Sequence, residues 1–382
     1  MQVERVNRKR YWIFWNTTIL PSQKAPRYKM ISKDSLNLEW LHKVSSTNNK
    51  ADLILIEKVV RALLLLEGLV ESGLDFVFKG GTALMLHMKS SKRLSIDIDI
   101  VIQDPIELQQ MFNKISGEKG FIRVEEQKRT VNYAIQKAHY KFYYNPTYKT
   151  AQEEDYVLMD ILSEQPQYAN LVALPIESLF VQQEGQPLHV NVPSLNDLLG
   201  DKLTAFAPNT TGIPYMKGGN SKAMEIIKQL YDTGNLFDLS SNLEVIASTF
   251  QKFAIVELGY RDMGDDWTIV LDDIYQTALL LSTRGFEGTG DLEALLQGIR
   301  QIKGYIFSES YSPEKAVIHA SKAAYISVLI RRNQTSIERF GDPLEMAEWV
   351  IEQPFCTKLN KLKKSNPEAF FYWYKIYLLE KV

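Results

Sequence analysis

The chain has 382 residues, of which 45% are hydrophobic and 24% are charged. This length exceeds what one small core needs and favours two domains, and the composition excludes a chain that is disordered throughout. The formal net charge of −2 and the pI near 6.3 exclude a general attraction to nucleic acid or to an anionic membrane. A polyanionic partner must therefore meet a local basic patch.

The single cysteine and the N-terminal residues further narrow the class of protein. Cys356 alone excludes an internal disulfide framework and a cysteine-based zinc site, and it fits a reducing cytosol. No apolar run reaches the roughly 20 residues that a membrane-spanning helix requires, so we expect no membrane association. Residues 11–15 form an aromatic run, but it is too short for a signal peptide and polar residues follow at once. We interpret residues 1–30 as an N-terminal extension of uncertain order.

Four elements are expected in the next part of the chain. Apolar residues at helical spacing predict a helix over residues 51–72. A short buried strand at 76–78 and a helix at 82–89 follow, with a glycine pair between them. Residues 94–102 alternate between isoleucines and polar residues, which predicts a half-buried strand with an acidic edge.

The remaining elements predict an α+β fold with strands first and helices second. Apolar and alternating runs predict strands at 122–125, 139–144, 156–162 and 189–192, and helical spacing predicts helices at 194–206 and 222–239. A loop rich in Pro, Gly and Asn at 208–219 joins these two helices, and the chain is helical from about residue 240. We therefore expect a mixed sheet flanked by helices in a first domain, residues 31–200, and an all-helical second domain, residues 201–382.

The sequence KGGTAL at positions 79–84 is the first part of a candidate phosphate site. The backbones of Gly80 and Gly81 can turn tightly and approach a ligand without an obstructing Cβ atom. Thr82 can cap the helix that follows, and the free amides of its first turn would face a triphosphate. We therefore expect Gly80, Gly81 and Thr82 to bind a nucleotide.

Two carboxylates, Asp97 and Asp99, follow on the strand predicted at 94–102. Side chains at i and i+2 of a strand share one face and lie about 6.5–7 Å apart at Cα, so both can converge on one or two Mg²⁺ ions. Asp160 interrupts an otherwise apolar strand, where an acid without a partner is costly to bury, and it is the expected third metal ligand. Three carboxylates around two ions would bind the attacking and leaving oxygens of an in-line displacement.

Lys202 and Arg93 are the cations that we place against the β- and γ-phosphates. Each signal has an ordinary explanation by itself, because Asp-x-Asp pairs are common on exposed strands and glycine pairs are common in turns. Asp160 could likewise be a hydrogen-bonded edge residue. Together and in this order, the signals favour an enzyme that acts on a nucleoside triphosphate.

Longer motifs extend this interpretation. KGGTAL together with RLSIDID at 93–99 resembles the nucleotidyltransferase toxins of the AbiEii/AbiGii family, the toxin components of type IV toxin–antitoxin systems. LLGDKLTA at 198–205 is similar to the lysine helix of that family, and KQLYDTGNLF at 228–237 is similar to its distal acidic helix. The resemblance implies a minimal polymerase-β-like nucleotidyltransferase fold for the first domain.

The resemblance also implies roles for individual residues. The expected nucleotide-binding residues are Lys79, Gly80, Gly81, Thr82, Arg93, Ser95 and Lys202. Asp97 and Asp99 correspond to metal ligands, Asp160 to the third acid of the general fold, and Asp232 to the last catalytic acid of the family. Whether Asp160 or Asp232 activates the acceptor hydroxyl stays open.

Members of this family transfer nucleotides from an NTP, in several cases to the 3′ acceptor end of tRNA. The resemblance therefore implies an NTP substrate, Mg²⁺ in a two-ion site, a tRNA acceptor and a cognate antitoxin. It implies a bacterial cytoplasmic toxin of a toxin–antitoxin or phage-defence system. Two alternatives remain, namely transfer to a small molecule of the aminoglycoside type or to a protein, and a non-catalytic nucleotide-binding module. The chain contains no Walker-type loop and no Gly-x-Ser-x-Gly motif, which disfavours P-loop enzymes and hydrolases.

The C-terminal region contains a basic stretch at 358–364 and an aromatic stretch at 370–374. Such a combination can contact the phosphates and bases of RNA. A solvated helix end followed by a buried aromatic stripe explains the same pattern, and we favour this second interpretation.

Overall fold

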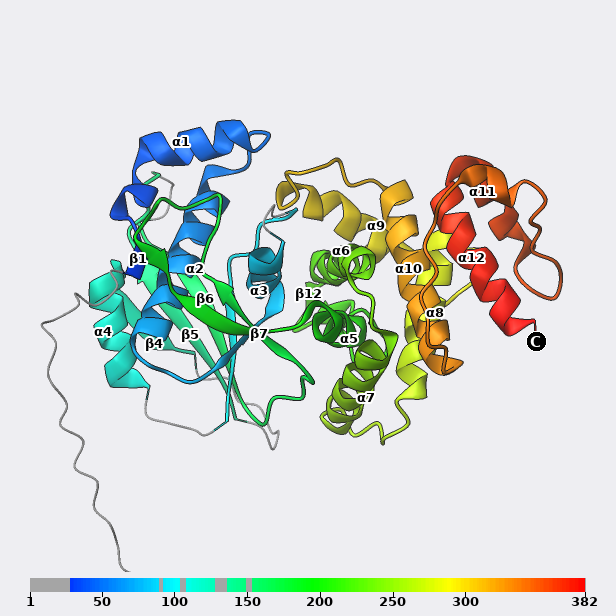
Figure 1. Ribbon diagram of the computed structural model, residues 1–382, viewed down its shortest axis with the longest axis horizontal. Coiled ribbons are helices and arrows are strands. Elements are labelled where there is room, and N and C mark those ends of the chain that lie inside the picture. Colours follow the sequence, from blue (N-terminus) through cyan, green and yellow to red (C-terminus); the bar gives the residue numbers. More distant parts are fainter. Residues whose placement is uncertain (1–27, 89–91, 104–107, 128–135, 149–152, 382) are drawn as a thin grey trace, which may run out of the picture.

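The computed structural model describes residues 28–88, 92–103, 108–127, 136–148 and 153–381. The main sheet lies in the first part of the chain and the second part consists of packed helices, so the predicted α+β order is confirmed (Figure 1). Residues 1–27 of the predicted N-terminal extension lie outside the described residues, and β1 (Tyr28–Ile31) begins within its last residues. None of the described helices is long and apolar enough to cross a membrane.

A five-stranded mixed sheet forms the centre of the first part. Its strands are β2 (Val77–Lys79), β3 (Ile98–Ile102), β4 (Arg123–Glu126), β5 (Gln136–Tyr144) and β6 (Asp155–Ser163). They lie in the order β2-β3-β6-β5-β4, and β3 and β6 are parallel whereas the other pairs are antiparallel. The register of the parallel pair places Asp99 opposite Asp160, which brings together two acids that are distant in the sequence.

Helices cover one face of this sheet. Helix α2 (Leu53–Glu71) contacts β6 and α4 (Gln109–Lys119) contacts β4, whereas α1 (Leu38–Thr47) packs against α2. Ile100, Phe142 and Met159 point into the resulting core, because alternate residues of a strand face opposite sides. The carboxylates of Asp99 and Asp160 therefore belong to the other face of β3 and β6.

The smaller sheets were largely absent from the prediction. They consist of β7 (Leu171–Pro175) with β10 (His189–Pro193), β1 with β8 (Gln183–Glu184) and β9 (Gln186–Pro187), and β11 (Met216–Lys217) with β12 (Asn220–Ser221). Only β10 was predicted, at residues 189–192. Strands β8, β9, β11 and β12 have two residues each, which leaves no alternation for a sequence to show.

Two local predictions around the glycine pair are wrong in detail. Helix α3 (Gly80–His87) begins at Gly80, so Thr82 lies inside the helix and does not cap it. The predicted strand at 94–102 is shortened to β3, and residues 94–97 have no place in the ladder. The reason is that β2 ends at Lys79, opposite Asp99, where Gly80 turns the chain into α3 with a φ of 79°.

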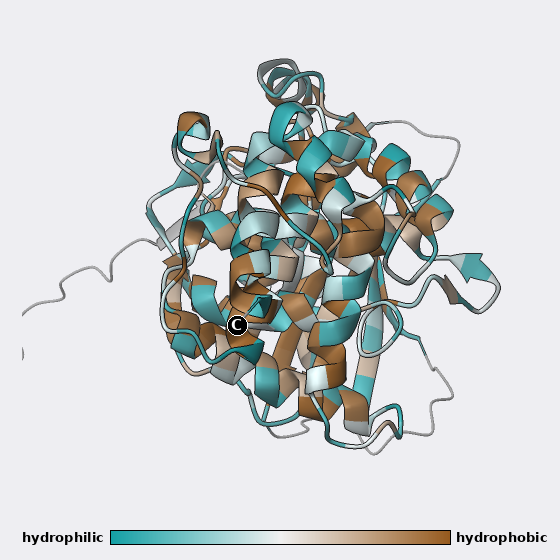
Figure 2. Ribbon diagram, turned by 90° about the vertical axis from the view of Figure 1, so that its right-hand side faces the viewer, coloured by the Kyte–Doolittle hydropathy of each residue, from teal (hydrophilic) through white to brown (hydrophobic). Residues whose placement is uncertain are grey.

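Helices form the rest of the molecule, as predicted. They are α5 (Leu195–Ala205), α6 (Ala223–Leu239), α7 (Leu243–Gly259), α8 (Thr268–Ser282), α9 (Leu292–Gln301), α10 (Pro313–Arg331), α11 (Leu362–Ser365) and α12 (Pro367–Glu380). A 3-10 turn, η2 (Ile302–Gly304), follows α9. Helix α10 packs against α6, α8 and α12. The helices carry both hydrophobic and hydrophilic residues, as expected for amphipathic helices around a shared core (Figure 2).

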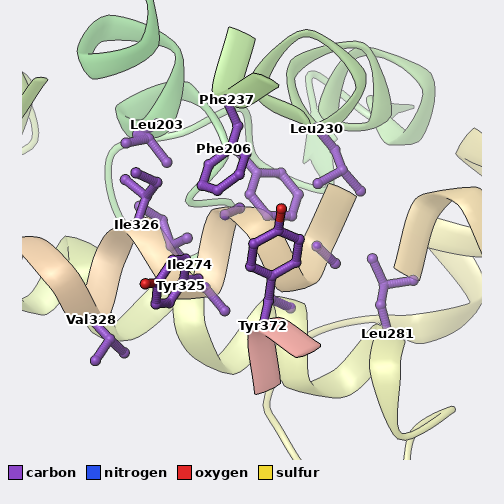
Figure 3. Close-up of a cluster of buried hydrophobic side chains, with 14 of the residues drawn as sticks. Leu203, Phe206, Leu230, Phe237, Ile274, Leu281, Tyr325, Ile326, Val328 and Tyr372 are labelled. Carbon is purple, nitrogen blue, oxygen red and sulfur yellow. The ribbon is translucent and has the colours of Figure 1, made fainter. Parts of the chain in front are cut away.

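The core of the helical part contains many aromatic side chains. Phe206, Phe237 and Tyr372 converge from α6, α12 and the end of α5 (Figure 3), and the ring centroids of Phe237 and Tyr372 are 5.2 Å apart. Phe370 and Trp373 are fully buried in the same core. The aromatic stretch at 370–374 is therefore mainly a buried stripe, as we favoured, and its rings are largely unavailable to stack on RNA bases.

The hydrophobic clusters suggest where one part ends and the other begins. The sheet cluster ends with Val192, whereas Leu198 of α5 already belongs to the helical cluster. Helix α5 is continuous across residue 200, where the sequence placed the domain boundary. We therefore propose that the boundary lies before α5, because a helix that packs as one unit belongs to one core.

The contact between α5 and α7 requires a glycine. A Cβ atom on Gly200 would lie 2.7 Å from the carbonyl oxygen of Ile246 and 2.9 Å from the amide nitrogen of Phe250, and backbone atoms within a helix cannot move away easily. We expect Gly200→Ala to lower the free energy of unfolding by about 1–3 kcal/mol, as overpacked cores generally do.

Gly259→Ala, at the end of α7, is the matched control for this measurement. A Cβ atom there meets nothing within 4 Å, so alanine should leave stability unchanged or raise it by up to about 1 kcal/mol. Urea unfolding of both variants measures the difference. Equal stabilities would contradict the close approach of α5 and α7.

Candidate functional site

A cavity of about 280 Å³ lies where the sheet meets α5 and α6. Most of the predicted site residues line it, namely Lys79, Gly80, Gly81, Arg93, Ser95, Asp97, Asp99 and Lys202. They come from β2, the start of α3, the segment before β3, β3 itself and α5. The structure therefore brings together motifs that are more than a hundred residues apart. Thr82, Asp160 and Asp232 do not line the cavity.

The glycine pair is required by the side chains packed against it. A Cβ atom on Gly80 would overlap the carboxylate of Asp99. A Cβ atom on Gly81 would lie 2.6 Å from the hydroxyl oxygen of Ser95 and 2.7 Å from the guanidinium of Arg93. The backbone turn thus seats one acid and one cation directly against the chain, and larger residues would displace both.

Thr82 acts on the backbone of the acidic segment. Its side chain is fully buried, and its hydroxyl donates a 2.6 Å hydrogen bond to the carbonyl oxygen of Asp97. The predicted contact between Thr82 and a nucleotide is therefore not supported by its position. The hydroxyl instead fixes the segment that carries Asp97, which lies outside the ladder of the sheet.

Ionising both Asp97 and Asp99 is unfavourable when no counterion is bound. Burial, together with the negative charges of Asp160 and Asp97, raises the pKa of Asp99 to about 7. Burial also raises the pKa of Asp97, although the ammonium of Lys228 opposes the shift. Two carboxylates in such a site are hard oxygen donors whose repulsion a divalent cation would relieve, so Asp97 and Asp99 fit a Mg²⁺ ion.

Asp160 does not complete the predicted three-carboxylate cluster. Its carboxylate lies 2.7 Å from Nδ1 of His139, its register partner on β5, and its side chain is 39% exposed. In the described part of the chain, no three His, Cys, Asp or Glu side chains lie close enough together to hold a metal ion. The structure thus supplies Asp97 and Asp99 as candidate metal ligands at the cavity, and Asp160, paired with His139, lies on the neighbouring strand.

Asp232 is the most heavily paired acid of the site. It is 1% exposed and binds the guanidinium of Arg93 through both oxygens, at 2.7 and 2.6 Å, while Lys202 lies 3.2 Å from Oδ2. Burial would raise the pKa of Asp232, but the charges of Arg93 and Lys202 outweigh it and lower the pKa below its usual range. This acid therefore holds the two cations in place, and its position does not support the predicted role of a catalytic acid.

Polar groups besides Asp232 hold Lys202 and Lys79 at the cavity. Lys202 also donates a hydrogen bond of 2.9 Å to the amide oxygen of Gln229. Helices α5 and α6, which the loop at 208–219 joins, therefore lie close together here. Lys79 lies 3.8 Å from Asp201, and Tyr168 donates to the same carboxylate at 2.8 Å. Both lysines are thereby fixed at the cavity wall before any ligand binds.

Several residues of the site were missed by sequence reasoning. They are His139, Asp201, Glu225, Lys228, Gln229 and Tyr305. Asp201, Lys228 and Gln229 lie inside the two helical motifs, so their positions beside Lys202 and Asp232 were available as a signal. His139 depended on the register of β5 and β6, and Tyr305 depended on tertiary contacts, and neither leaves a local pattern.

Comparison with known proteins decides the family. The model of the nucleotidyl transferase AbiEii toxins of type IV toxin–antitoxin systems matches residues 64–301, which is more than half of the chain. The chain belongs to the AbiEii family. It is a nucleotidyltransferase, and the matched range contains every predicted site residue.

The chain is similar to a crystal structure from H. pylori that is assigned as a nucleotidyltransferase, with 13% identity and a TM-score of 0.37, over 73% of this chain and 94% of that chain. No curated protein matches its sequence.

The raised pKa of Asp99 predicts a pH-dependent effect on the stability of this AbiEii protein. The folded state binds a proton at Asp99 up to about pH 7, whereas the unfolded carboxyl releases it near 3.8, so stability falls as the pH rises between these values. Asp99→Asn removes this loss. We expect the asparagine variant to gain thermal stability over the wild type, with a larger gain at pH 8 than at pH 5.5, when both are measured in EDTA. A gain that does not grow with pH would contradict the raised pKa.

The ion pairs of Asp232 predict a large loss of stability when its charge is removed. Asp232→Asn keeps the shape but leaves two buried cations without their carboxylate, which should lower the free energy of unfolding by about 3–5 kcal/mol. Asp272→Asn is the control, because Asp272 pairs with Arg331 at an exposed position and should cost less than about 1 kcal/mol. Chemical unfolding measures both, and similar losses for the two variants would show that the Asp232 network is not a buried one.

Proposed function

We propose that this AbiEii protein transfers a nucleoside monophosphate from an NTP to an acceptor hydroxyl in a Mg²⁺-dependent reaction, and that the acceptor is the 3′ end of a tRNA. The observation that carries the proposal is the cavity itself. Asp97 and Asp99 face the turn at Gly80, and Lys202 lies on the opposing helix. Such an arrangement offers a metal–phosphate site beside a backbone that a triphosphate can approach closely.

The proposed chemistry is an in-line displacement at the α-phosphorus. The acceptor oxygen forms a bond to this phosphorus, the bond to the β-phosphate oxygen breaks, and pyrophosphate leaves with the electron pair. The hydroxyl proton passes to a base. When bound to Asp97 and Asp99, Mg²⁺ would neutralise the charge that develops on the phosphate oxygens.

The residues of the chain provide positioning and charge. Lys202 and Arg93 line the cavity as cations whose orientation is fixed by Asp232, so they need little reorganisation to receive the charge of the leaving pyrophosphate. The amides at Gly80 and Gly81 border the same cavity and can approach phosphate oxygens. These groups together orient the triphosphate with its α-phosphorus near the two carboxylates.

Of the two acids that the sequence left open for activating the acceptor, Asp160 is the one that the geometry favours. It is opposite Asp99 in the sheet and its side chain is partly exposed, so an acceptor can reach it. Asp232 has both oxygens bound to cations and is buried. We therefore propose that Asp160, paired with His139, activates the acceptor hydroxyl.

The biological setting that we propose follows from the family. A toxin of a type IV system is expected to have a cognate antitoxin, and a nucleotidyltransferase that acts on tRNA is expected to work in the bacterial cytoplasm. A role in phage defence belongs to the same proposal. These points rest on family membership rather than on any contact within the chain.

Transfer of labelled nucleotide tests the proposal. We expect the wild type, with α-labelled NTPs, Mg²⁺ and total tRNA, to label tRNA, whereas Asp97→Ala and Lys202→Met lower the rate by at least about a hundred-fold, because each removes charge stabilisation at the reacting phosphate. Asp265→Ala, at an exposed position outside the cavity, is the control and should label at the wild-type rate.

The acceptor is tested by the same reaction. Label on an aminoglycoside-type small molecule or on protein, with no label on any RNA, would exclude the tRNA acceptor while preserving nucleotidyl transfer. Binding of NTP without transfer to any acceptor would exclude the enzymatic function for this chain.

A further inference from the structure

Most cations of the cavity already have a carboxylate partner. Arg93 and Lys202 share Asp232, and Lys79 lies 3.8 Å from Asp201. A paired cation contributes only part of its charge to an incoming phosphate, because the acid behind it offsets the rest. These residues are therefore better suited to orientation than to supplying most of the countercharge.

Lys228 differs from them. Its ammonium lies 3.8 Å from the centroid of the Tyr305 ring, and both residues line the cavity. Within the described residues, no carboxylate oxygen lies within 4.0 Å of its Nζ atom, so its positive charge has no ion-pair partner there. It is also the positive charge that acts most strongly on Asp97, which places it near the candidate metal carboxylates.

Tyr305 is held at this position by the segment that carries Arg93. The amide of Leu94 donates a 2.8 Å hydrogen bond to the carbonyl oxygen of Tyr305, and Arg93 forms an isolated β-bridge with Ile306. The ring that supports Lys228 is thereby fixed to the same backbone that borders the glycine pair. Neither Tyr305 nor Ile306 lies within residues 64–301 that match the family model.

We propose that Lys228 is a phosphate-binding residue of the nucleotide cavity, held over the ring of Tyr305 until the triphosphate of an NTP takes its ammonium as a partner. The proposal rests on the proposed function, because it names a ligand contact within the same site. A ring face attracts an ammonium only modestly, so the lysine can exchange it for a charge-assisted hydrogen bond to a phosphate oxygen.

The charge environment of Lys228 supports this assignment. Burial is the largest cause that lowers the pKa of Lys228 to about 8, and the positive charge of Arg93 is the second. The negative charges of Asp97, Glu225 and Asp232 oppose this shift. The ammonium is therefore weakly compensated in the free protein. Phosphate groups entering the cavity would provide the missing negative charge and would favour the protonated lysine.

Binding of two probes to substituted proteins tests the proposal. Lys228→Met keeps the length of the side chain and removes its charge, Lys228→Arg keeps the charge, and Lys252→Met removes an exposed lysine from α7 as the control. The affinities of each protein for an NTP and for inorganic tripolyphosphate are measured by titration calorimetry in Mg²⁺ buffer, after thermal unfolding has shown that each variant is folded.

We expect Lys228→Met to weaken both probes about ten-fold or more, Lys228→Arg to stay within about three-fold of the wild type, and Lys252→Met to bind normally. Unchanged binding of both probes to Lys228→Met would overturn the proposal. A loss for the NTP without a loss for tripolyphosphate would also overturn it, because Lys228 would then contact the base or the ribose. A wild type that binds neither probe would contradict the proposed function itself, and this inference with it.

The pH dependence of binding gives an independent readout. The ammonium of Lys228 is lost as the pH rises through about 8, so the affinity of the wild type for tripolyphosphate should fall between pH 7 and pH 9. Arginine remains charged over this range, so Lys228→Arg should show a smaller fall, and the difference isolates the lysine from other groups that titrate. Identical pH profiles for the two proteins would overturn the proposal.

Discussion

The carboxylate of Asp232 is the constraint on which the site depends. It lies on α6 in the helical part of the molecule, yet it binds Arg93 from the segment before β3 and Lys202 from α5. Two buried cations near each other are stable only with a countercharge, and here a single acid supplies it with good geometry. Without Asp232 the two cations would repel each other, which would weaken the contact of α5 and α6 with the segment before β3.

The helical part therefore contributes to the chemistry through its packing. Helix α6 buries Leu230 and Phe237 in the helical core (Figure 3). Its Lys228 and Asp232 line pockets together with Arg93 of the sheet part. Helix α5 does the same with Leu203 on one side and Lys202 on the other. Because each helix is anchored by a well-packed apolar face, the polar residues on its other face have defined positions. The hydrophobic core thus sets the positions of α5 and α6, and Asp232 then fixes the orientation of Arg93 and Lys202.

The local features of the site could be predicted from the sequence, and the long-range ones could not. Gly80 and Asp99 are recognisable because a glycine turn and an alternating strand are local patterns with direct geometric meaning. The partner of Asp232 was not recognisable, because Arg93 lies 139 residues away in the sequence. His139 reached Asp160 through strand register, and Tyr305 reached the cavity through backbone contacts of its segment with Arg93 and Leu94. Family resemblance supplied Asp232 and supported Lys202, and the pairing of Asp232 with both cations leads us to propose a positioning role for it.

The most direct test of this account is the structure of the protein bound to a non-hydrolysable NTP and Mg²⁺. We expect the triphosphate in the cavity, with Mg²⁺ between its oxygens and the carboxylates of Asp97 and Asp99, and with Asp232 still bound to Arg93 and Lys202. A triphosphate bound elsewhere would contradict the account. So would an Asp232 that leaves its cations and ligates the metal, because this acid would then take part in the chemistry instead of holding the residues that do.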